Sequence, residues 1–510
     1  MPMLTDLIAL VPLFPLLAAL LIALYALPGR PRGDAAERLT ARGALFAVTL
    51  AFALLAALIV SALIFGPLKP VNFGTWFAAG AIEIRLSFVL DGLSLTAALG
   101  VAVIGWLTLF FSAQYMHREP GFHRFFAVLC LFLAAMLFIV LAGNAVLMFI
   151  GWELSGLASF LLIGYAHERA TATRNAVRAF VTNRIGDAGF LLGLAIAYRY
   201  LGNTEWITIA AGAGAISHLA VGVVVFGFVV AAMAKSAQLP FTPWIARALE
   251  GPTPSSAIFY GSLMIHAGVY LCLRLEPLLA HAPVIMGLLA AIGLLTALYG
   301  WFVGLTQSDV KSALIFGTIT QVGLMFLWIG LGAFDLAAWH LGLHAMFRAY
   351  QFLAAPSYMH HTGTPARPVP RWLGRRQALY TAALERLWVE AFTDATVTRP
   401  AQVLAAEMRS FDDQVVSRLA GTPAEQHAPE DEAASKGVQD DVRGHGLAGA
   451  ILEWIAPRLH RVEQRLLLTG GAGVQRTFRA LGGYLEVVER LLERPRYLIL
   501  IIVIALAAAL

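Results

Sequence analysis

The sequence predicts an all-α, polytopic membrane protein with about 12 transmembrane helices. Hydrophobic residues make up 59% of the 510 positions and charged residues only 13%. The mean hydropathy is +0.74. A soluble domain of this size does not have such a composition. Apolar runs of about 20 residues, the length that crosses a bilayer, recur through most of the chain.

Eleven of these runs precede residue 362, and a shorter twelfth closes the chain. The eleven runs lie near 4–27, 43–66, 91–115, 122–142, 144–166, 175–200, 216–240, 252–275, 282–304, 311–331 and 337–360. The first run has neither a basic n-region nor a small-residue cleavage site, so we expect a retained helix and not a signal peptide.

The basic residues predict topology. A net charge of +5 and a pI near 9.3 would suggest nucleic acid as a partner if the chain were soluble. Here, however, the arginines fall in short loops and one late segment, as topology determinants do. We therefore expect no nucleic-acid partner. The loops after odd-numbered runs carry Arg30, Arg32, Arg38, Arg42, Arg118, Arg124, Arg169, Arg174, Arg178, Arg247 and Lys311. The other loops carry only Lys69, Arg85, Arg199 and Arg274. The positive-inside rule then places the N-terminus outside a bacterial inner membrane and residues 362–496 in the cytoplasm.

The composition divides the chain into three parts. Residues 1–361 form the predicted membrane core, residues 362–496 a cytoplasmic amphipathic segment, and residues 497–510 a C-terminal membrane anchor in the bilayer. LAGAILEWIAPRLHRVEQRLLL and FRALGGYLEVVERLLERP repeat apolar residues at helical spacing. The acidic, breaker-rich stretch 421–446 predicts a mobile surface loop.

The residue types that support catalysis or bind cofactors are sparse. Cys130 and Cys272 both lie in apolar runs and are too few for a disulfide framework or an iron–sulfur cluster. No nucleotide-binding loop, nucleophile triad or metal-ligand cluster is found. We therefore expect no cofactor or metal in this chain, and no catalysis by this chain alone.

Ionisable residues recur inside the apolar runs, where each costs at least about 2.5–3.5 kcal/mol to insert. They are Glu153, Arg184, Asp187, Lys235, His266, His340, His344 and Arg348. Each has a structural alternative. Arg184 and Asp187, three residues apart, can neutralise each other. Glu153 and Lys235 can form an interhelical ion pair, which gives little net stability. His266 can be a packed, hydrogen-bonded histidine.

Lys235 and Pro240 lie close together in AAMAKSAQLPFTPW. A buried lysine can release or take up a proton when a negative charge moves near it. Proline breaks a membrane helix, and such breaks line hydrated cavities within protein. His340, His344 and Arg348 occur at i, i+4 and i+8 and therefore share one helix face, where histidine can pass a proton between its ring nitrogens. These features indicate a proton path.

Five motifs in order resemble the antiporter-like, proton-conducting subunits of respiratory complex I, most closely subunit L. They are GWELSGLASFLLIGY, FVTNRIGDAGFLLG, AKSAQLPFTPWIARALEGPTPSSA, TQSDVKSALIFGTITQVGLMF and HLGLHAMFRA, within residues 85–360. The resemblance implies an antiporter-like fold with a broken helix and makes Glu153 and Lys235 the central proton-handling pair. LERLWVEAFTDATVTRPAQVLA resembles the start of the lateral helix of subunit L. The expected pathway comprises Glu153, Arg184, Asp187, Lys235, His266, Lys311, His340, His344 and Arg348, with the helix break at Pro240.

The chain departs from subunit L at three points. Tyr260 stands where the family has a histidine, and His266 lies two turns later. Arg348 replaces a lysine and cannot relay a proton as lysine can. Hydrophilic sequence begins at about His361, where subunit L continues with a second broken helix. The inverted repeat is then incomplete, and an outward half-channel of the usual kind should be missing.

The third departure makes the chain similar to the membrane subunit of the two-component, DAB-type inorganic-carbon accumulation complexes. That resemblance implies a large cytoplasmic partner that resembles a β-carbonic anhydrase and holds the zinc. It also implies that proton or sodium movement through this chain drives CO2 hydration or bicarbonate accumulation by the partner. The first alternative is subunit L of a proton-pumping NADH:quinone oxidoreductase, with other complex I membrane subunits as partners. The second is a non-conducting scaffold for a partner enzyme.

Overall fold

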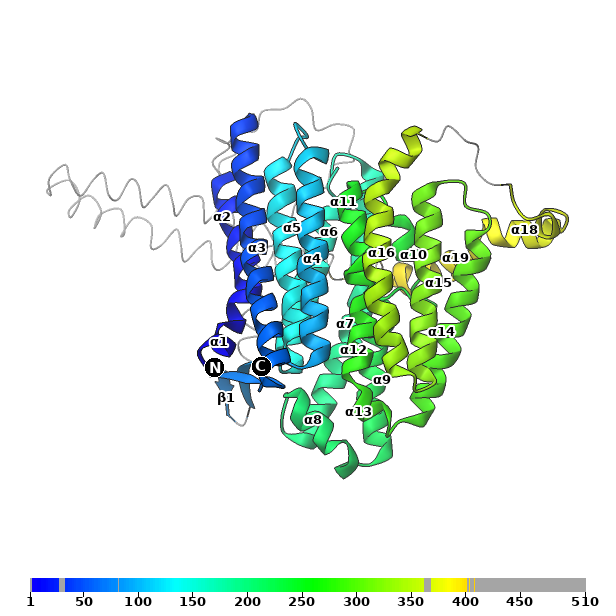
Figure 1. Ribbon diagram of the computed structural model, residues 1–510. Coiled ribbons are helices and arrows are strands. Elements are labelled where there is room, and N and C mark those ends of the chain that lie inside the picture. The colour runs from blue at the N-terminus through cyan, green and yellow to red at the C-terminus, as the bar shows by residue number, and fades with distance from the viewer. Residues whose placement is uncertain are drawn as a thin grey trace, which may run out of the picture. The chain divides into compact units, whose positions relative to one another are not determined.

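A computed structural model describes residues 2–26, 33–80, 82–361, 368–400, 403 and 408. The chain divides into two compact units, Met1–Thr398 and Arg399–Leu510. Nearly all described residues lie in the first unit, which is a bundle of helices (Figure 1). The predicted acidic loop 421–446 and the predicted anchor 497–510 lie outside the described residues.

The first part of the bundle contains the segments that correspond to the first six apolar runs. They are α1 (Pro2–Thr5), the 3₁₀ turn η1 (Asp6–Ala9), α2 (Leu10–Ala26), α3 (Asp34–Phe65), α4 (Gly92–Tyr115), α5 (Phe122–Leu141), α6 (Ala145–Ile163) and α7 (Ala170–Leu201). Asp91 and Asn144 start α4 and α6, each accepting a hydrogen bond from a backbone N–H of the first turn.

The second part is less regular. It contains α8 (Trp206–Gly212), η2 (Ala213–Ala215), α9 (His218–Lys235), α10 (Pro243–Arg247), α11 (Thr253–Ser256), η3 (Ala257–Ser262), η4 (Met264–His266), α12 (Ala267–Arg274), α13 (Glu276–Leu279), α14 (Pro283–Gly304), α15 (Val310–Gly330) and α16 (Phe334–His361). Of these, η3 is a π-helical turn and η4 a 3₁₀ turn, so the eighth predicted run is one irregular span and not a uniform helix.

Ten segments of the described chain are long and apolar enough to cross a membrane, and they match the first ten predicted runs. The eleventh run is α16, which has 28 residues. It falls outside that count because its histidines and arginine reduce its apolar character. The polytopic helical fold is therefore confirmed, with α16 as a helix of membrane-spanning length but mixed polarity.

A short β-hairpin interrupts the helices and was not predicted. Strands β1 (Val71–Ala79) and β2 (Ile82–Phe88) pair antiparallel between α3 and α4. Strand β2, with the sequence IEIRLSF, alternates apolar and polar residues as a strand does, whereas β1, with the sequence VNFGTWFAA, has no regular alternation. Figure 1 shows the hairpin at one end of the bundle, beside α1.

The span Thr253–Arg274 lies at the centre of the bundle, because its most apolar window is 100% buried, against 22% for α3 and 33% for α14. In Figure 1, α2 and α14 lie at opposite edges. Small residues allow the helices to approach closely. A β-carbon at Gly293 of α14 would lie 2.4 Å from the backbone nitrogen of Leu327 in α15.

Residues 368–398 pack against the helices, so the predicted boundary after residue 361 falls inside the first unit. Their elements are α17 (Arg371–Gly374), α18 (Gln377–Leu384), η5 (Arg386–Trp388), α19 (Val389–Thr393) and η6 (Asp394–Thr398). Glu390 pairs with Arg178 of α7 and, at 2.8 Å, with Arg247 of α10. Asp394 pairs with Arg178 at 2.5 Å. The Thr393 hydroxyl donates to the Pro240 carbonyl at 3.0 Å.

Glu390→Gln is expected to loosen residues 389–398 from the bundle. Burial alone would raise the pKa of Glu390, but hydrogen bonds from Arg247 and Arg178 and their positive charges hold that pKa below its ordinary value of 4.5. The ionised carboxylate therefore favours docking above pH 4.5, and this contribution is lost as the pH falls through the lower, docked pKa. Losing hydrogen bonds to charged groups should speed amide exchange of this segment about tenfold.

The measurement is hydrogen–deuterium exchange, corrected for the intrinsic pH dependence. Wild-type protein should show faster exchange of residues 389–398 in acid, and the glutamine variant should show a smaller acid-dependent component, because Asp394 still pairs with Arg178. Glu385→Gln, which changes an exposed acid of the same segment, is the matched control. Unchanged exchange in Glu390→Gln would contradict the assigned role of the ion pairs.

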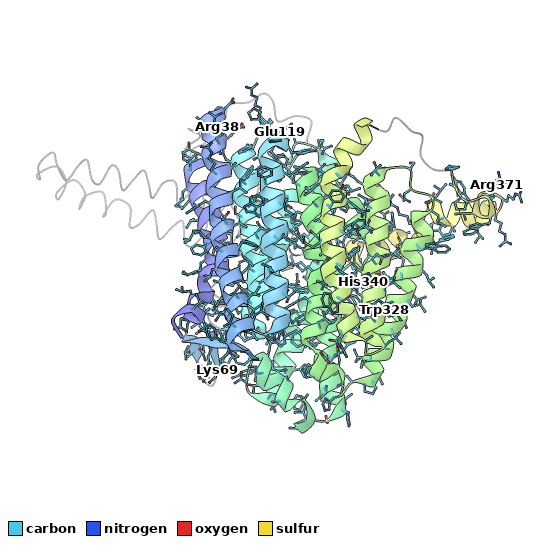
Figure 2. The ribbon with its side chains drawn as sticks, viewed as in Figure 1. Arg38, Lys69, Glu119, Trp328, His340 and Arg371 are labelled. Atoms are coloured by element: carbon cyan, nitrogen blue, oxygen red, sulfur yellow. The ribbon has the colours of Figure 1, made fainter. Side chains whose placement is uncertain are left out.

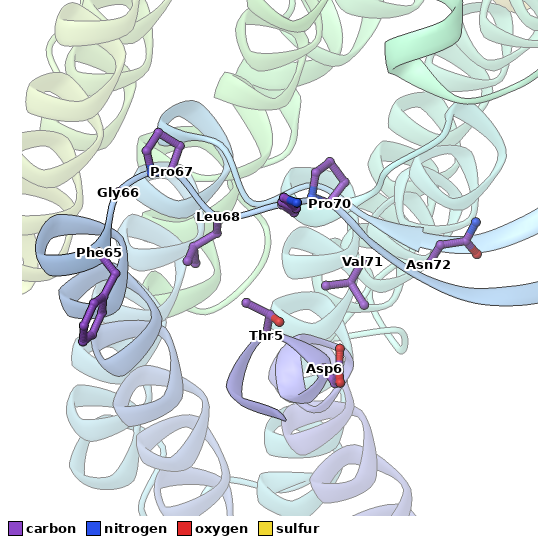
Figure 3. A pocket seen from close by; sticks show the side chains of 10 residues that line it. Thr5, Asp6, Phe65, Gly66, Pro67, Leu68, Pro70, Val71 and Asn72 are labelled. Atoms are coloured by element: carbon purple, nitrogen blue, oxygen red, sulfur yellow. The ribbon is translucent and has the colours of Figure 1, made fainter. Parts of the chain in front are cut away.

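A hollow of about 520 Å³ opens where α1, η1 and the end of α3 meet the start of β1 (Figure 3). It is lined by Thr5, Asp6 and residues 65–72. None of the ionisable residues predicted within the membrane lines this hollow.

Candidate functional site

Lys235 is the last residue of α9 and is only 1% exposed. Its Nζ donates to the Trp152 carbonyl of α6 at 3.1 Å and lies 4.9 Å from the centre of the Trp152 ring. After Lys235 the chain leaves the helix until α10 begins at Pro243. The predicted break is therefore present, but it starts at Ser236, four residues before Pro240. Proline cannot donate to the carbonyl of residue 236, and it disfavours helix at Leu239.

The first cluster contains Glu153, Arg184 and Asp187 beside Lys235. Arg184 pairs with Glu153 across α6 and α7, and its Nε lies 3.0 Å from Asp187 Oδ2 in an ion pair without hydrogen-bond geometry. Trp152 Nε1 donates to Asp187 Oδ1 at 2.9 Å. Trp152 thus contacts both Asp187 and Lys235. Apart from its position before Glu153, nothing in the sequence marked Trp152 as a member of the site.

The alternative of a direct interhelical ion pair between Glu153 and Lys235 is not what the structure has. The ion-pair partner of Glu153 is Arg184, and no carboxylate of the described residues lies within 4.0 Å of Lys235 Nζ. A β-carbon at Gly156 would lie 3.5 Å from Arg184 Nη2 and 3.6 Å from Lys235 Nζ. Glycine therefore leaves room for two cations to approach one side of α6. When all four groups are ionised, their two negative and two positive charges balance.

The second cluster forms on the predicted histidine face of α16. His266 Nε2 lies 2.9 Å from His344 Nδ1, and the rings of His340 and His344 meet edge to face at 6.0 Å. His340 Nε2 lies 2.9 Å from Gln321 Oε1 of α15. His266 was expected either in the pathway or as a packed histidine, and it is both buried and bonded to His344. Figure 2 shows His340 about midway between Arg38 and Lys69, which mark opposite ends of the bundle.

Arg348 fixes the hydrogen-bond direction in this cluster. Its Nε donates to His344 Nε2 at 3.4 Å. Arginine has no acceptor, so Nε2 of His344 is unprotonated and a neutral His344 carries its hydrogen on Nδ1. His344 then donates to His266. Hydrogen bonds therefore run in one direction, from Arg348 to His344 and from His344 to His266. The second of these bonds can reverse only if a proton moves.

Polar groups at the helix break contact the span that carries His266. Ser236, next to Lys235, donates to the Ile265 carbonyl, next to His266, at 2.6 Å. A β-carbon at Gly268 would lie 2.2 Å from the Ala232 carbonyl oxygen, so α9 and α12 are in close contact. Gln238 Oε1 and Ser256 Oγ are buried without a protein partner. Buried polar atoms of this kind require water or another partner.

Two residues that the sequence singled out lie apart from both clusters. Lys311 Nζ donates to the Thr253 hydroxyl at 2.7 Å. The same hydroxyl lies 3.0 Å from Tyr115 Oη. Tyr260, at the family's histidine position, donates to the Ala248 carbonyl at 2.8 Å. Within the described ranges, no group of three or more His, Cys, Asp or Glu side chains could hold a metal ion.

The family model described as "NADH:quinone oxidoreductase/Mrp antiporter, TM" matches residues 142–369, which include every residue of the two clusters. Over these residues the chain is similar to the antiporter-like membrane subunits of NADH:quinone oxidoreductases and Mrp antiporters. A second model, for the N-terminus of complex I chain 5, matches residues 76–126 of this antiporter-like subunit.

Curated relatives agree with this family. NADH-quinone oxidoreductase subunit L of Escherichia coli is 40% identical over 298 residues, which is 56% of this chain and 48% of the relative. Subunit 5 of the chloroplastic NAD(P)H-quinone oxidoreductase of Nephroselmis olivacea is 35% identical over 362 residues, covering 69% and 55%. The antiporter-like subunit thus spans about half the length of these relatives. A chain of the Mrp complex from Dietzia sp. has the same fold, with a TM-score of 0.61, 24% identity and coverage of 99% and 62%.

Proposed function

We propose that this antiporter-like subunit translocates protons as the membrane part of a larger complex. The observation that carries this proposal is the sequence of buried ionisable groups from Glu153 through Lys235 to the histidines, interrupted only by the polar helix break. Charged groups within membrane helices are costly, and they commonly mark proton relays. Histidine and lysine can both give and take protons, whereas the neighbouring apolar side chains cannot.

In the proposed route, Lys235 exchanges a proton with His266 through the polar groups at the break. Exchange between His266 and His344 requires their hydrogen bond, which His344 donates, to reverse, and His340, whose ring contacts that of His344, continues the route. Arg184, held by Glu153 and Asp187, sets the electrostatic potential at Lys235. Arg348 keeps its own proton and orients His344. Lys311 is proposed to serve one end of the route, at Thr253.

A membrane partner is proposed to cover one side of α6 and α7. The side chains of Glu153 and Arg184 are 27% and 38% exposed, although both residues lie near the middle of their spans. Charge facing lipid at this depth would be unfavourable, so another transmembrane helix should lie against it. A soluble partner cannot reach this depth. This argument favours a complex with further membrane subunits, as in subunit L of NADH-quinone oxidoreductase.

An inorganic-carbon complex with a zinc, carbonic-anhydrase-like partner is the second candidate. The polar composition after residue 361 favours it, since further membrane spans are expected there in subunit L. None of the relatives reported above is named for inorganic carbon. A bacterial inner membrane location, an outside N-terminus and a cytoplasmic segment 362–496 belong to both candidates.

The experiment that separates these candidates is purification of the tagged protein from its native membrane in mild detergent, followed by identification of its partners and a zinc assay. Several hydrophobic subunits with flavin and iron–sulfur proteins would establish the oxidoreductase. One large soluble zinc protein would establish the inorganic-carbon complex. A partner enzyme that stays active with Glu153→Gln and Lys235→Ala would instead indicate a non-conducting scaffold.

A further inference from the structure

A polar network that the proposed route does not use lies at the end of the bundle that carries the hairpin. Tyr270 Oη donates to the Val140 carbonyl at 2.6 Å and lies 3.2 Å from Ser94 Oγ. Arg274 donates to Ser94 Oγ at 2.6 Å, to Tyr270 Oη at 2.9 Å and to Asp91 Oδ1 at 3.1 Å. Three helices, α4, α5 and α12, therefore meet in one hydrogen-bonded network.

This network extends from the buried interior to the surface. Tyr270 is 2% exposed, the Arg274 side chain 10% and the Asp91 side chain 43%. Asp91 lies directly after the hairpin, at the end where Figure 1 shows β1. Figure 2 shows Lys69 at this same end, opposite Arg38 and Glu119. The exposed carboxylate is thus the outermost member of the network.

Tyr270, the inner member of the network, lies about one helical turn after His266 of the histidine cluster. His266 ends η4 and directly precedes α12, and Tyr270 and Arg274 follow it at i+4 and i+8, so the three residues lie along one side of this span. His266 is bonded to His344, so this face leads from the histidines to Asp91. Neighbouring positions on α12 are apolar residues such as Val269 and Leu273, which offer no alternative polar path along the helix.

We propose that protons pass between the histidine cluster and the hairpin end of the bundle along a path formed by Tyr270, Ser94 and Asp91, which we call the lane. Arg274 is the group that closes the lane. This inference rests on the proposed proton translocation and adds its outer section. Each hydroxyl accepts one proton and releases its own, so neither oxygen keeps a charge. Asp91 accepts the proton and then releases it to water.

Arg274 suits a closing role because its charge is balanced by a titratable carboxylate at the surface. In the described residues, Asp91 is the carboxylate that pairs with Arg274. When Asp91 takes up a proton, its attraction for Arg274 falls, and the guanidinium is released from the lane. When Asp91 loses the proton, the pair forms again and a fixed positive charge repels protons returning from outside.

A purely structural role for Asp91 can be separated from this one. Asp91 accepts a hydrogen bond from the Ser94 N–H and so caps α4. Asparagine caps a helix as well as aspartate does, so Asp91→Asn can keep the cap while it removes the charge and the second oxygen that accepts from Arg274. Tyr270→Phe removes the hydroxyl and keeps the ring. Asp91→Glu restores a carboxylate. Glu83→Gln, which removes the exposed hairpin carboxylate paired with Arg85, is the control at the same end.

The test measures proton flux into vesicles reconstituted with the purified complex, together with the thermal midpoint of each variant. We expect Asp91→Asn and Tyr270→Phe to reduce flux at least tenfold without lowering the midpoint, while Asp91→Glu and Glu83→Gln keep more than half of it. Flux within twofold of wild type in both Asp91→Asn and Tyr270→Phe would overturn the lane, and so would a loss that only follows a lowered midpoint. If flux still depends on Lys235, the proposed function survives that result. If flux does not depend on Lys235, that result contradicts both the lane and the proposed function.

Discussion

Vesicles containing the Lys235→Ala variant are expected to show no more proton flux than empty vesicles. The reason is that Lys235 is the titratable group at the helix break, between the carboxylates and the histidines. Loss of a proton-transfer group reduces such rates on the order of a hundredfold or more. The measurement is the fluorescence of a pH-sensitive dye inside vesicles under an imposed potential.

Charge balance supports the same expectation. With Lys235 present, Glu153 and Asp187 face two cations; without it, two carboxylates face Arg184 alone. The uncompensated negative charge would be costly within the membrane, so one carboxylate should hold a proton throughout the cycle. Lys235→Arg tests proton exchange separately from charge, because arginine keeps the charge but does not release its proton. It should also be inactive.

Lys69→Ala is the matched control for this variant, since it removes an exposed lysine at the end of the bundle. It should leave flux unchanged. Conduction by Lys235→Ala at more than half the wild-type rate would refute the assignment of Lys235. Conduction by Lys235→Arg alone would show that a fixed charge, and not proton exchange, is what the site requires.

His344→Gln is expected to have the second largest effect, reducing proton flux on the order of a hundredfold. His344 contacts His266, His340 and Arg348, so it is the junction of the histidine cluster. Glutamine can still donate and accept hydrogen bonds but has no ring through which a proton can pass. Flux and the thermal midpoint should be measured together, because a buried polar substitution can also destabilise the bundle.

His218→Gln provides the comparison, since His218 is exposed at the start of α9. This variant should conduct as wild type does. An active His344→Gln variant would show that protons bypass the histidines. An inactive variant with a greatly lowered midpoint would assign His344 a structural role and would require the route to be drawn elsewhere.

The sequence predicted the positions of the helices well, because a membrane span needs about 20 apolar residues and leaves a continuous signal. It also placed His340, His344 and Arg348 on one face, since helical spacing alone determines that. It did not predict the partner of Glu153. Arg184 and Lys235 are both cations near α6, and only the packing of α7 and α9 decides which one reaches the carboxylate.

The irregular turns around His266 were also beyond the sequence. The π turn Ala257–Ser262 contains Gly261, but glycine is also frequent in regular membrane helices and does not mark such a turn. This turn is part of the span that brings His266 against α16. Ion pairs between distant segments, such as Glu390 with Arg178, leave no periodic signal either. The fold was therefore predictable from local composition, whereas the site depends on contacts between helices.

The most direct test of the central claim uses the unmodified protein. The complex purified from its native membrane is reconstituted into vesicles, and proton uptake is followed under an imposed potential with and without sodium. We predict proton uptake that persists without sodium and stops when the vesicles contain the Lys235→Ala form. Absence of uptake under all conditions, or uptake that does not depend on Lys235, would contradict proton translocation through this subunit.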